Sequence, residues 1–171
     1  MQNPTPAIRL LEASDIPQIV KAFKELRWNK PASQYERYLG EQKLGLREVY
    51  IAFVNEQFGG YLTISWISTY GPFRERNIPE IVDLNVLPKF RRLGIATQLM
   101  EKAEDEIAKV SAIAGVGVGM TADYGAAQRL YILRGFIPDG LGLHWRDHHV
   151  SYREELRVDD DLALYLTKEL K

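Results

Sequence analysis

Apolar and polar residues alternate along this chain with two different periods, and these periods predict a series of strands and helices. Seven segments show the alternation or the short apolar run of a strand, namely Ala7–Ser14, Glu48–Val54, Gly60–Thr69, Glu80–Leu87, Gly115–Met120, Phe136–Trp145 and Asp161–Leu170. Four segments repeat apolar residues every three or four positions, as on the buried face of a helix, namely Ile16–Leu26, Gln34–Gly45, Ile95–Ile107 and Gly125–Arg134. Their order along the chain predicts a mixed α/β fold.

Local signals refine several of these elements. Ser33 and Glu36 have the spacing of a capping box, which predicts the start of the second helix. Gly135 follows the last helical segment and is the expected left-handed terminator. Glycine occupies every second position of Gly115–Met120, so one face of this strand lacks side chains, and a helix or a flat ligand can approach its backbone closely. Tyr70–Pro79 shows neither period and is predicted to be a loop.

Composition narrows the class of protein. The 171 residues, 46% of them apolar, are expected to form a single globular domain spanning residues 1–171. Twenty-two Lys and Arg residues against 23 Asp and Glu give a net charge of −1, so no overall field attracts nucleic acid or an acidic membrane. The absence of cysteine excludes disulfides, thiolate metal sites and a cysteine nucleophile. No apolar run approaches the roughly 18 residues of a membrane span, and we expect a cytoplasmic protein.

The stretch "VLPKFRRLGIATQLM" leads from a predicted strand, past a proline and two arginines, to the glycine at which a predicted helix begins. The first amides of a helix lack carbonyl partners, and the helix dipole adds about half a positive charge there. Gly94 has no Cβ, so an anion could approach the amides of residues 93–96, and Arg91 and Arg92 would add flanking positive charge. The stretch therefore predicts a local phosphate site.

The spacing Arg91-x-x-Gly94-x-Ala96 on a strand, turn and helix resembles the acetyl-CoA pyrophosphate loop of the GNAT family of N-acetyltransferases. "GAAQRLYILRGF" resembles the second signature of that family, and the order of the predicted elements resembles that of the family over nearly the whole chain. "YGAAQRLYILRGFIPDG" and the closing "DDDLALYLTKEL" resemble a GNAT subgroup of acetyltransferases. The resemblance implies a mostly antiparallel central sheet of about seven strands flanked by four helices. It also implies a set of residues that bind acetyl-CoA: Asn85, Val86, Arg91, Arg92, Leu93, Gly94, Ile95, Ala96, Thr97, Tyr124 and Ala127.

The glycines and arginines also have alternative interpretations. Tyr124 stands where many family members have asparagine, which puts one cofactor hydrogen bond in doubt. The arginines alone could belong to a solvated turn that keeps a helix end soluble. A Walker loop would need glycine and lysine before serine or threonine, and the pair Gly115 and Gly117 lacks the third glycine of a dinucleotide motif.

The reaction that the resemblance implies is direct attack of a primary amine on the acetyl thioester. Deprotonating a lysine-like amine at pH 7 costs about 4.6 kcal/mol, whereas an α-amine costs about 1.4 kcal/mol, so a base helps the former most. Asp83 is the leading candidate, because it lies on the strand before the loop, on the face opposite Val82 and Leu84. Glu80 is the second, and either could act through a water chain. Tyr131 matches the tyrosine that many members place near the thioester sulfur. Asp83 could instead bond to neighbouring backbone, and Tyr131 could be a core residue.

The acceptor side gives weaker signals. Aromatic and charged residues of two segments could line an acceptor pocket, although most of the aromatics fit a core as well, namely Trp28, Tyr35, Tyr38, Trp66, Tyr70, Phe73, Arg74, Glu75 and Arg76. "HWRDHH" lacks a recognisable zinc spacing, so a solvated loop or part of the acceptor rim is preferred to a metal site, and no metal is expected.

The sequence is compatible with three functions. The leading hypothesis is an acetyl-CoA-dependent N-acetyltransferase acting on a primary amine of a small molecule or a peptide. The alternatives are a non-catalytic acyl-CoA-binding sensor and a small-ligand or metal-binding protein that uses the histidine segment. The family resemblance also makes a homodimer a plausible assembly.

Overall fold

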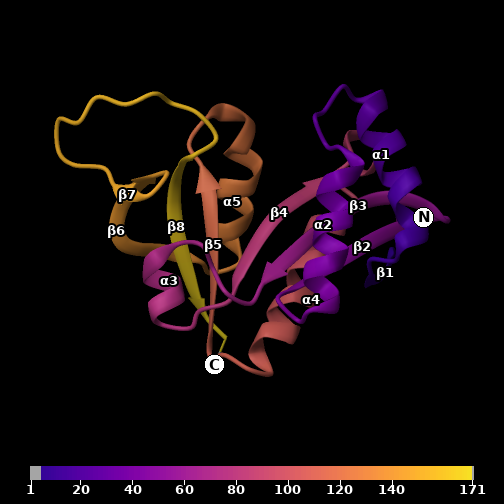
Figure 1. Cartoon of the computed structure of the whole chain (residues 1–171), viewed down its shortest axis with the longest axis horizontal. Helices are drawn as coiled ribbons and strands as arrows, with labels where there is room; N and C mark the ends of the chain where they lie inside the picture. Colours follow the sequence, from indigo (N-terminus) through magenta and orange to yellow (C-terminus); the bar gives the residue numbers. More distant parts are fainter. Residues whose placement is uncertain (1–4, 171) are drawn as a thin grey trace. The chain divides into compact units, whose positions relative to one another are not determined.

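The structure is a computed structural model that describes residues 5–170 (Figure 1). Its strands are β1 (Ala7–Leu10), β2 (Arg47–Val54), β3 (Gln57–Ser65), β4 (Glu80–Val86), β5 (Ile113–Gly119), β6 (Ile137–Trp145), β7 (His148–His149) and β8 (Leu162–Glu169). Its α-helices are α1 (Ile16–Glu25), α2 (Ala32–Lys43), α3 (Gly71–Glu75), α4 (Ile95–Ala108) and α5 (Gly125–Leu133).

The predicted fold class is confirmed. The ladders β1–β2, β2–β3, β5–β8, β6–β7 and β6–β8 are antiparallel, and β4–β5 is parallel. Within the described range the eight strands and five α-helices exceed the expected seven and four. The additional elements are the short β7 and α3, which are too brief to show a period in the sequence.

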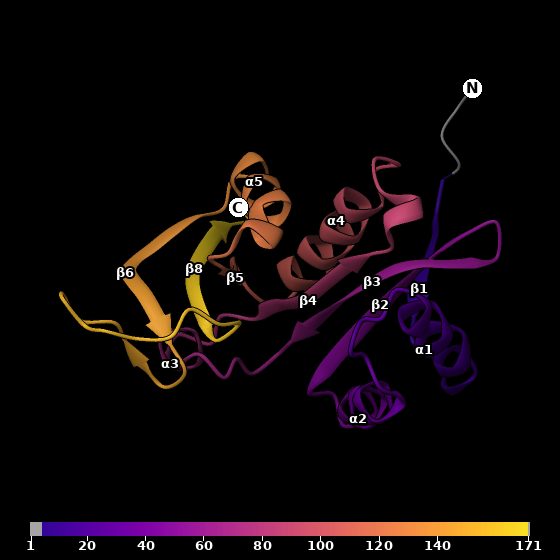
Figure 2. The same cartoon turned by 90° about the horizontal axis from the view of Figure 1, so that it is seen from above.

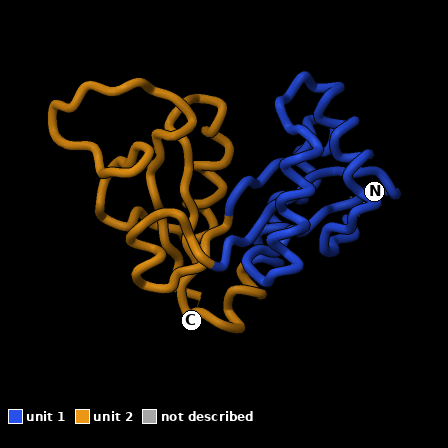
Figure 3. Tube along the Cα trace, viewed as in Figure 1, with its two compact units in different colours: residues 1–66, 82–103 blue, residues 67–81, 104–171 orange. Residues whose placement is uncertain are grey.

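The chain divides into two compact units (Figure 3). Unit 1 comprises residues 1–66 and 82–103, and unit 2 comprises residues 67–81 and 104–171. Strand β4 and helix α4 each begin in one unit and end in the other.

Unit 1 is built on the antiparallel strands β1, β2 and β3. The β2–β3 hairpin turns at Asn55 and Glu56, whose φ angles of 48° and 63° are left-handed, as a two-residue turn between twisted strands requires. Helices α1 and α2 cover one side of these strands, and the first turns of α4 lie on the other (Figure 2). Phe23, Tyr35 and Tyr61 are fully buried in the core on the α1 and α2 side.

The start of α2 differs from the prediction. The helix begins at Ala32, directly after Pro31, and no side chain caps it, so the capping box expected at Ser33 and Glu36 is wrong. Pro31 has the extended conformation that ends the preceding segment, and the helix follows at once. Such a box forms instead between Glu12 and Asp15, just before α1.

Unit 2 contains the first two residues of β4, followed in space by β5, β8, β6 and β7. The parallel ladder pairs Glu80 with Gly115 and Ile81 with Val116. The segment expected to be a loop contains α3, which has Pro72 in its first turn and buries Phe73. Ile78, after the helix, is also buried. A helix this short cannot show a helical period in the sequence.

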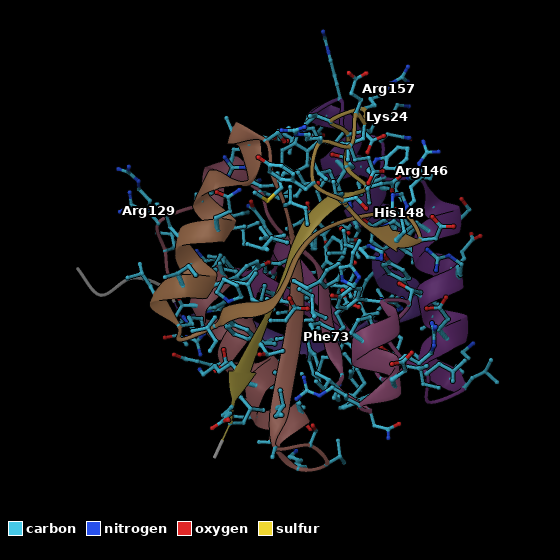
Figure 4. All side chains as sticks on the ribbon, turned by 90° about the vertical axis from the view of Figure 1, so that its left-hand side faces the viewer. Lys24, Phe73, Arg129, Arg146, His148 and Arg157 are labelled. Atoms are coloured by element: carbon cyan, nitrogen blue, oxygen red, sulfur yellow. The ribbon has the colours of Figure 1, made fainter. Side chains whose placement is uncertain are left out.

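The glycine face of β5 is occupied by aromatic side chains of unit 2. A Cβ atom on Gly115 would collide with the ring of Phe73, one on Gly117 would lie 2.8 Å from the ring of Tyr165, and one on Gly119 would lie 2.5 Å from the ring of Tyr124. Figure 4 shows Phe73 beside this strand. The predicted close approach therefore exists, but aromatic rings rather than a helix or a flat ligand make it.

Two further observations concern the elements themselves. Gly135 has a φ of 90°, which confirms it as the left-handed terminator of α5. None of the helices in residues 5–170 combines the length and the apolar character needed to cross a membrane.

Candidate functional site

The turn between β4 and α4 belongs to unit 1. A short 3-10 turn at Pro88–Phe90 is followed by left-handed residues at Arg92 (φ 62°) and Gly94 (φ 77°), and α4 then begins at Ile95. The amide of Gln98 bonds the carbonyl of Gly94 at 3.0 Å. The amides of Ile95, Ala96 and Thr97 precede this first helical bond and have no carbonyl one turn earlier to bind.

Gly94 leaves open space at this helix end. It is exposed, and the one atom that a Cβ here would meet within 4 Å is Nε2 of Gln98, at 3.8 Å. Its positive φ is also a conformation that glycine adopts without strain. Ile95 is almost fully buried and packs against β3, where a Cβ on Gly59 would lie 3.4 Å from Ile95 Cδ1, so the start of α4 is fixed to the strands.

Positive charge surrounds the open space. Lys89, Arg91 and Arg92 are exposed, and residues 84–97 include no acidic side chain. Arg91 Nε donates to the carbonyl of Val86 at 3.4 Å, and Lys89 Nζ donates to Gln57 Oε1 at 3.1 Å, so both cations are held near the turn. Free amides, room for an approaching atom and guanidinium groups together fit a phosphate or diphosphate group.

The end of β4 is fixed by a close approach to β3. A Cβ on Gly60 would lie 2.5 Å from the carbonyl oxygen of Asn85 and 3.0 Å from Val86 Cα, so only glycine allows this spacing. The amide of Leu87 donates to the carbonyl of Gly59 at 2.9 Å. The main chain at Asn85 and Val86, which we expect to bind the cofactor, is thereby held in place.

Asp83 is the centre of a polar cluster in unit 1. Its φ of 59° interrupts the regular alternation of β4. Oδ1 accepts hydrogen bonds from Lys30 Nζ at 2.6 Å and Asn85 Nδ2 at 2.8 Å. Oδ2 accepts bonds from Gln34 Nε2 at 2.8 Å, from the Tyr38 phenol at 3.0 Å and from the Tyr61 phenol. We name these six residues the Asp83 cluster.

The cluster determines the electrostatics of its members. Burial alone would raise the pKa of Asp83, but the Lys30 ammonium and the phenol hydrogen bonds outweigh burial and hold that pKa below its ordinary value. Burial and the charge of Asp83 raise the pKa of Tyr38 to about 12 and raise that of Tyr61 further. At neutral pH the cluster thus contains one carboxylate and neutral phenols.

A third phenol lies beside the cluster. The Tyr35 side chain is fully buried, and its hydroxyl interacts with the Tyr61 phenol. Its ring meets the ring of Tyr61 edge to face, with the centroids 5.5 Å apart. Burial raises the pKa of Tyr35, so this phenol is neutral at pH 7 as well.

The other two catalytic candidates lie in unit 2. Glu80 is buried and accepts a hydrogen bond from Ser68 Oγ, which in turn accepts one from the amide of Tyr70 at 3.0 Å. Tyr131 is also buried, with its ring centroid 6.1 Å from that of Phe136. Glu80 and Asp83 lie on the same strand, β4, but belong to different units.

The two cofactor candidates after β5 also lie in unit 2. Tyr124 covers Gly119 with its ring, and its phenol donates to Asp160 Oδ1 at 3.2 Å. Ala127 is half-buried on α5. Arg129, on the same helix, projects away from the protein (Figure 4).

The histidine segment forms the end of β6, within the predicted strand Phe136–Trp145, and the short β7. The imidazole of His144 is buried and lies edge to face against Tyr70, with the centroids 5.0 Å apart. The Tyr70 phenol donates to Asp139 Oδ2 at 2.7 Å and lies 2.9 Å from His149 Nε2. His148 is exposed (Figure 4). Its Nε2 lies 2.7 Å from Glu154 Oε1. Within residues 5–170, no group of three or more histidine or acidic residues could hold a metal ion.

Sequence reasoning did not find the partners of Asp83. Lys30 and Gln34 lie 53 and 49 residues before it, and neither belongs to a motif. Tyr38 was a candidate for the acceptor pocket and Tyr61 a residue of a predicted strand, and both donate to the carboxylate in the structure. No local signal in the sequence marks Lys30 or Gln34 as partners of Asp83.

One protein family and many solved structures are similar to this chain. The model of the acetyltransferase (GNAT) family matches residues 14–136. A comparison with curated proteins finds no match. Among solved structures, an N-acetyltransferase from Staphylococcus aureus Mu50 has a TM-score of 0.70 and 17% identity, covering 98% of this chain and 99% of the other.

Two further solved structures are similar. A ribosomal-protein-alanine N-acetyltransferase from Brucella melitensis has a TM-score of 0.69 and 16% identity, covering 95% of this chain and 99% of the other. A Salmonella typhimurium protein described as an acetyltransferase was solved with its cofactor acetyl-CoA. It has a TM-score of 0.67 and 18% identity, covering 97% of this chain and 94% of the other. Identities this low show a shared fold.

Proposed function

Because the chain belongs to the GNAT acetyltransferase family, whose model matches most of its length, we propose that it transfers an acetyl group directly from acetyl-CoA to a primary amine of a small molecule or a peptide. The observation that carries the proposal is the turn before α4, where free amides, open space at Gly94 and exposed arginines fit a diphosphate. We further propose that the protein acts in the cytoplasm.

The residues that would hold acetyl-CoA follow from this turn. The amides of residues 93–97 and the guanidinium groups of Arg91 and Arg92 would bind the diphosphate. The main chain of Asn85 and Val86 would pair with the amide-containing arm as an added strand does. Tyr124 and Ala127, which the family resemblance implies as cofactor residues, lie in unit 2. When bound, acetyl-CoA supplies the activated acetyl group as a thioester.

The amine must be neutral to react. Its nitrogen forms a bond to the acetyl carbon, the carbon–sulfur bond breaks, and the proton that the nitrogen then loses neutralises the leaving thiolate. Asp83 as the base stays a proposal, and its lowered pKa and five hydrogen-bond donors favour binding of a cation over acceptance of a proton. Glu80 remains the alternative base, and Tyr131 the proposed donor to the thiolate.

The test combines cofactor binding with thiol release. Gly94→Asp places a side chain and a negative charge where the diphosphate would bind, so we expect the Kd for coenzyme A in calorimetric titration to rise at least a hundredfold. Gly142→Asp is the matched control, because Gly142 has the same φ of 77° and no atom within 4 Å of a Cβ. Unchanged affinity in Gly94→Asp would contradict the loop assignment.

Thiol release distinguishes the transferase from the acyl-CoA sensor. Acetyl-CoA mixed with the protein and a panel of lysine-like and peptide amines should give free thiol, measured with a chromogenic disulfide. Tight binding of acetyl-CoA without thiol release across the panel would favour the sensor.

A further inference from the structure

The Lys30 side chain shows what the Asp83 cluster can bind. Lys30 carries a primary ammonium group, and its Nζ lies 2.6 Å from Asp83 Oδ1 and 3.2 Å from the Tyr61 phenol. The same nitrogen lies 5.8 Å from the centroid of the Tyr61 ring. A carboxylate, a phenol oxygen and a nearby aromatic face are the groups that recognise an alkylammonium ion.

We propose that Lys30 is a displaceable internal occupant of an ammonium subsite, and that the acceptor binds by replacing it with its own primary ammonium group at Asp83 and Tyr61. This inference rests on the proposed function only in assigning the ligand as the acceptor. The existence of the subsite rests on the contacts within unit 1.

The charge balance of the cluster selects a cation. If Lys30 moves away, Asp83 keeps four neutral donors, from Asn85, Gln34, Tyr38 and Tyr61. It then lacks the one cation that pairs with it in the described residues, while its side chain is only 16% exposed. A carboxylate this buried requires a compensating positive charge, and the contacts that Lys30 leaves suit N–H donors.

The position of Lys30 in the chain allows it to leave. It belongs to the connection between α1 and α2, and its amide bonds only to the nearby carbonyl of Trp28, at 3.0 Å. Withdrawing its side chain therefore breaks no helical hydrogen bond. Its side chain is 20% exposed, so solvent reaches the ammonium group.

Chemical rescue tests the subsite without any turnover. Lys30→Ala removes the internal ammonium, and n-butylammonium should then raise the Tm of the variant in a thermal-shift titration. The wild-type protein should not respond, because the tethered Lys30 ammonium outcompetes the free ion. Tetramethylammonium, which has no N–H donor, should not rescue. Lys24→Ala is the matched control, because Lys24 is an exposed lysine on α1, and it should show no response to either ion.

The outcomes separate the subsite from the proposed function. No rise in Tm for Lys30→Ala at ammonium concentrations that leave Lys24→Ala unaffected would overturn the subsite. If Lys30→Ala does not fold, Lys30→Met keeps the apolar stem of the side chain, and the same criterion applies to it. Because no acetyl-CoA is present, rescue without thiol release in the separate assay would leave the subsite standing and contradict the transferase.

A kinetic split tests the assignment of the ligand as the acceptor. With n-butylamine as acceptor, Lys30→Ala should lower the apparent KM severalfold, because the acceptor no longer competes with Lys30. The KM should also rise with pH as the free ammonium loses its proton. An unchanged KM in Lys30→Ala would overturn the acceptor assignment even if rescue is observed.

Discussion

Replacing Asp83 with asparagine removes the charge of the Asp83 cluster while keeping its shape. In Asp83→Asn the Lys30 ammonium, 20% exposed, loses its carboxylate, and the donors from Gln34 and Asn85 face an amide that can donate as well as accept. Breaking one partner of a buried pair costs about 3 to 5 kcal/mol. Because both side chains keep some contact with water, we expect a loss near the lower limit, about 3 kcal/mol at pH 7.

The pH dependence of this loss is the sharper test. The pKa of Asp83 is lowered in the folded protein, so its contribution is fully present above the unfolded pKa of about 3.9 and is lost as pH falls through the folded pKa. The difference in unfolding free energy between wild type and Asp83→Asn should therefore be constant from pH 7 to about pH 5 and shrink below about pH 4. Contributions of the other carboxylates cancel in the difference.

The assay is urea unfolding followed by circular dichroism at several pH values between 3 and 7. Glu56→Gln, an exposed carboxylate in the β2–β3 turn, is the control and should differ little from wild type at any pH. A wild-type minus Asp83→Asn difference that stays the same down to pH 3 would refute the assignment of the cluster as a carboxylate held by cationic and phenolic donors.

Two further substitutions test the close approaches of the backbone. Gly60→Ala should cost about 1 to 3 kcal/mol and weaken coenzyme A binding, because its Cβ would meet the main chain of Asn85 at 2.5 Å; Gly40→Ala, with open space in α2, should instead stabilise by about 0.5 to 1 kcal/mol. Urea unfolding and titration with coenzyme A check both, and equal behaviour of the two variants would contradict the proposed role of Gly60. Gly115→Ala should lower stability by about 1 to 3 kcal/mol by collision with Phe73. If Gly115→Ala is as stable as wild type in urea, the Phe73 ring moves aside without cost and the expected collision is refuted.

The sequence allowed prediction of those features that depend on neighbouring residues. The helix beginning after Gly94, the terminator Gly135 and the mixed α/β class all arise from spacing within about 15 residues. The turn with Arg91 and Arg92 was predicted as a local anion site for the same reason. The roles of these residues in binding stay predictions that the titrations above would test.

The features that escaped prediction depend on contacts distant in sequence. Asp83 was expected to present a side chain opposite Val82 and Leu84, but its left-handed φ changes that alternation. Its partner Lys30 lies 53 residues away, and no local pattern predicts such a pair. In the same way, α3 forms because Phe73 has the empty face of Gly115 to cover.

Because of its glycines, β5 has no side chains on one of its faces. Three rings cover that face, one each from α3, from β8 and from the turn before α5. Substitution of Phe73, Tyr165 or Tyr124 would therefore change the chemistry of that face without changing the strand. A larger residue on the strand therefore requires a smaller one at the ring that its Cβ would meet.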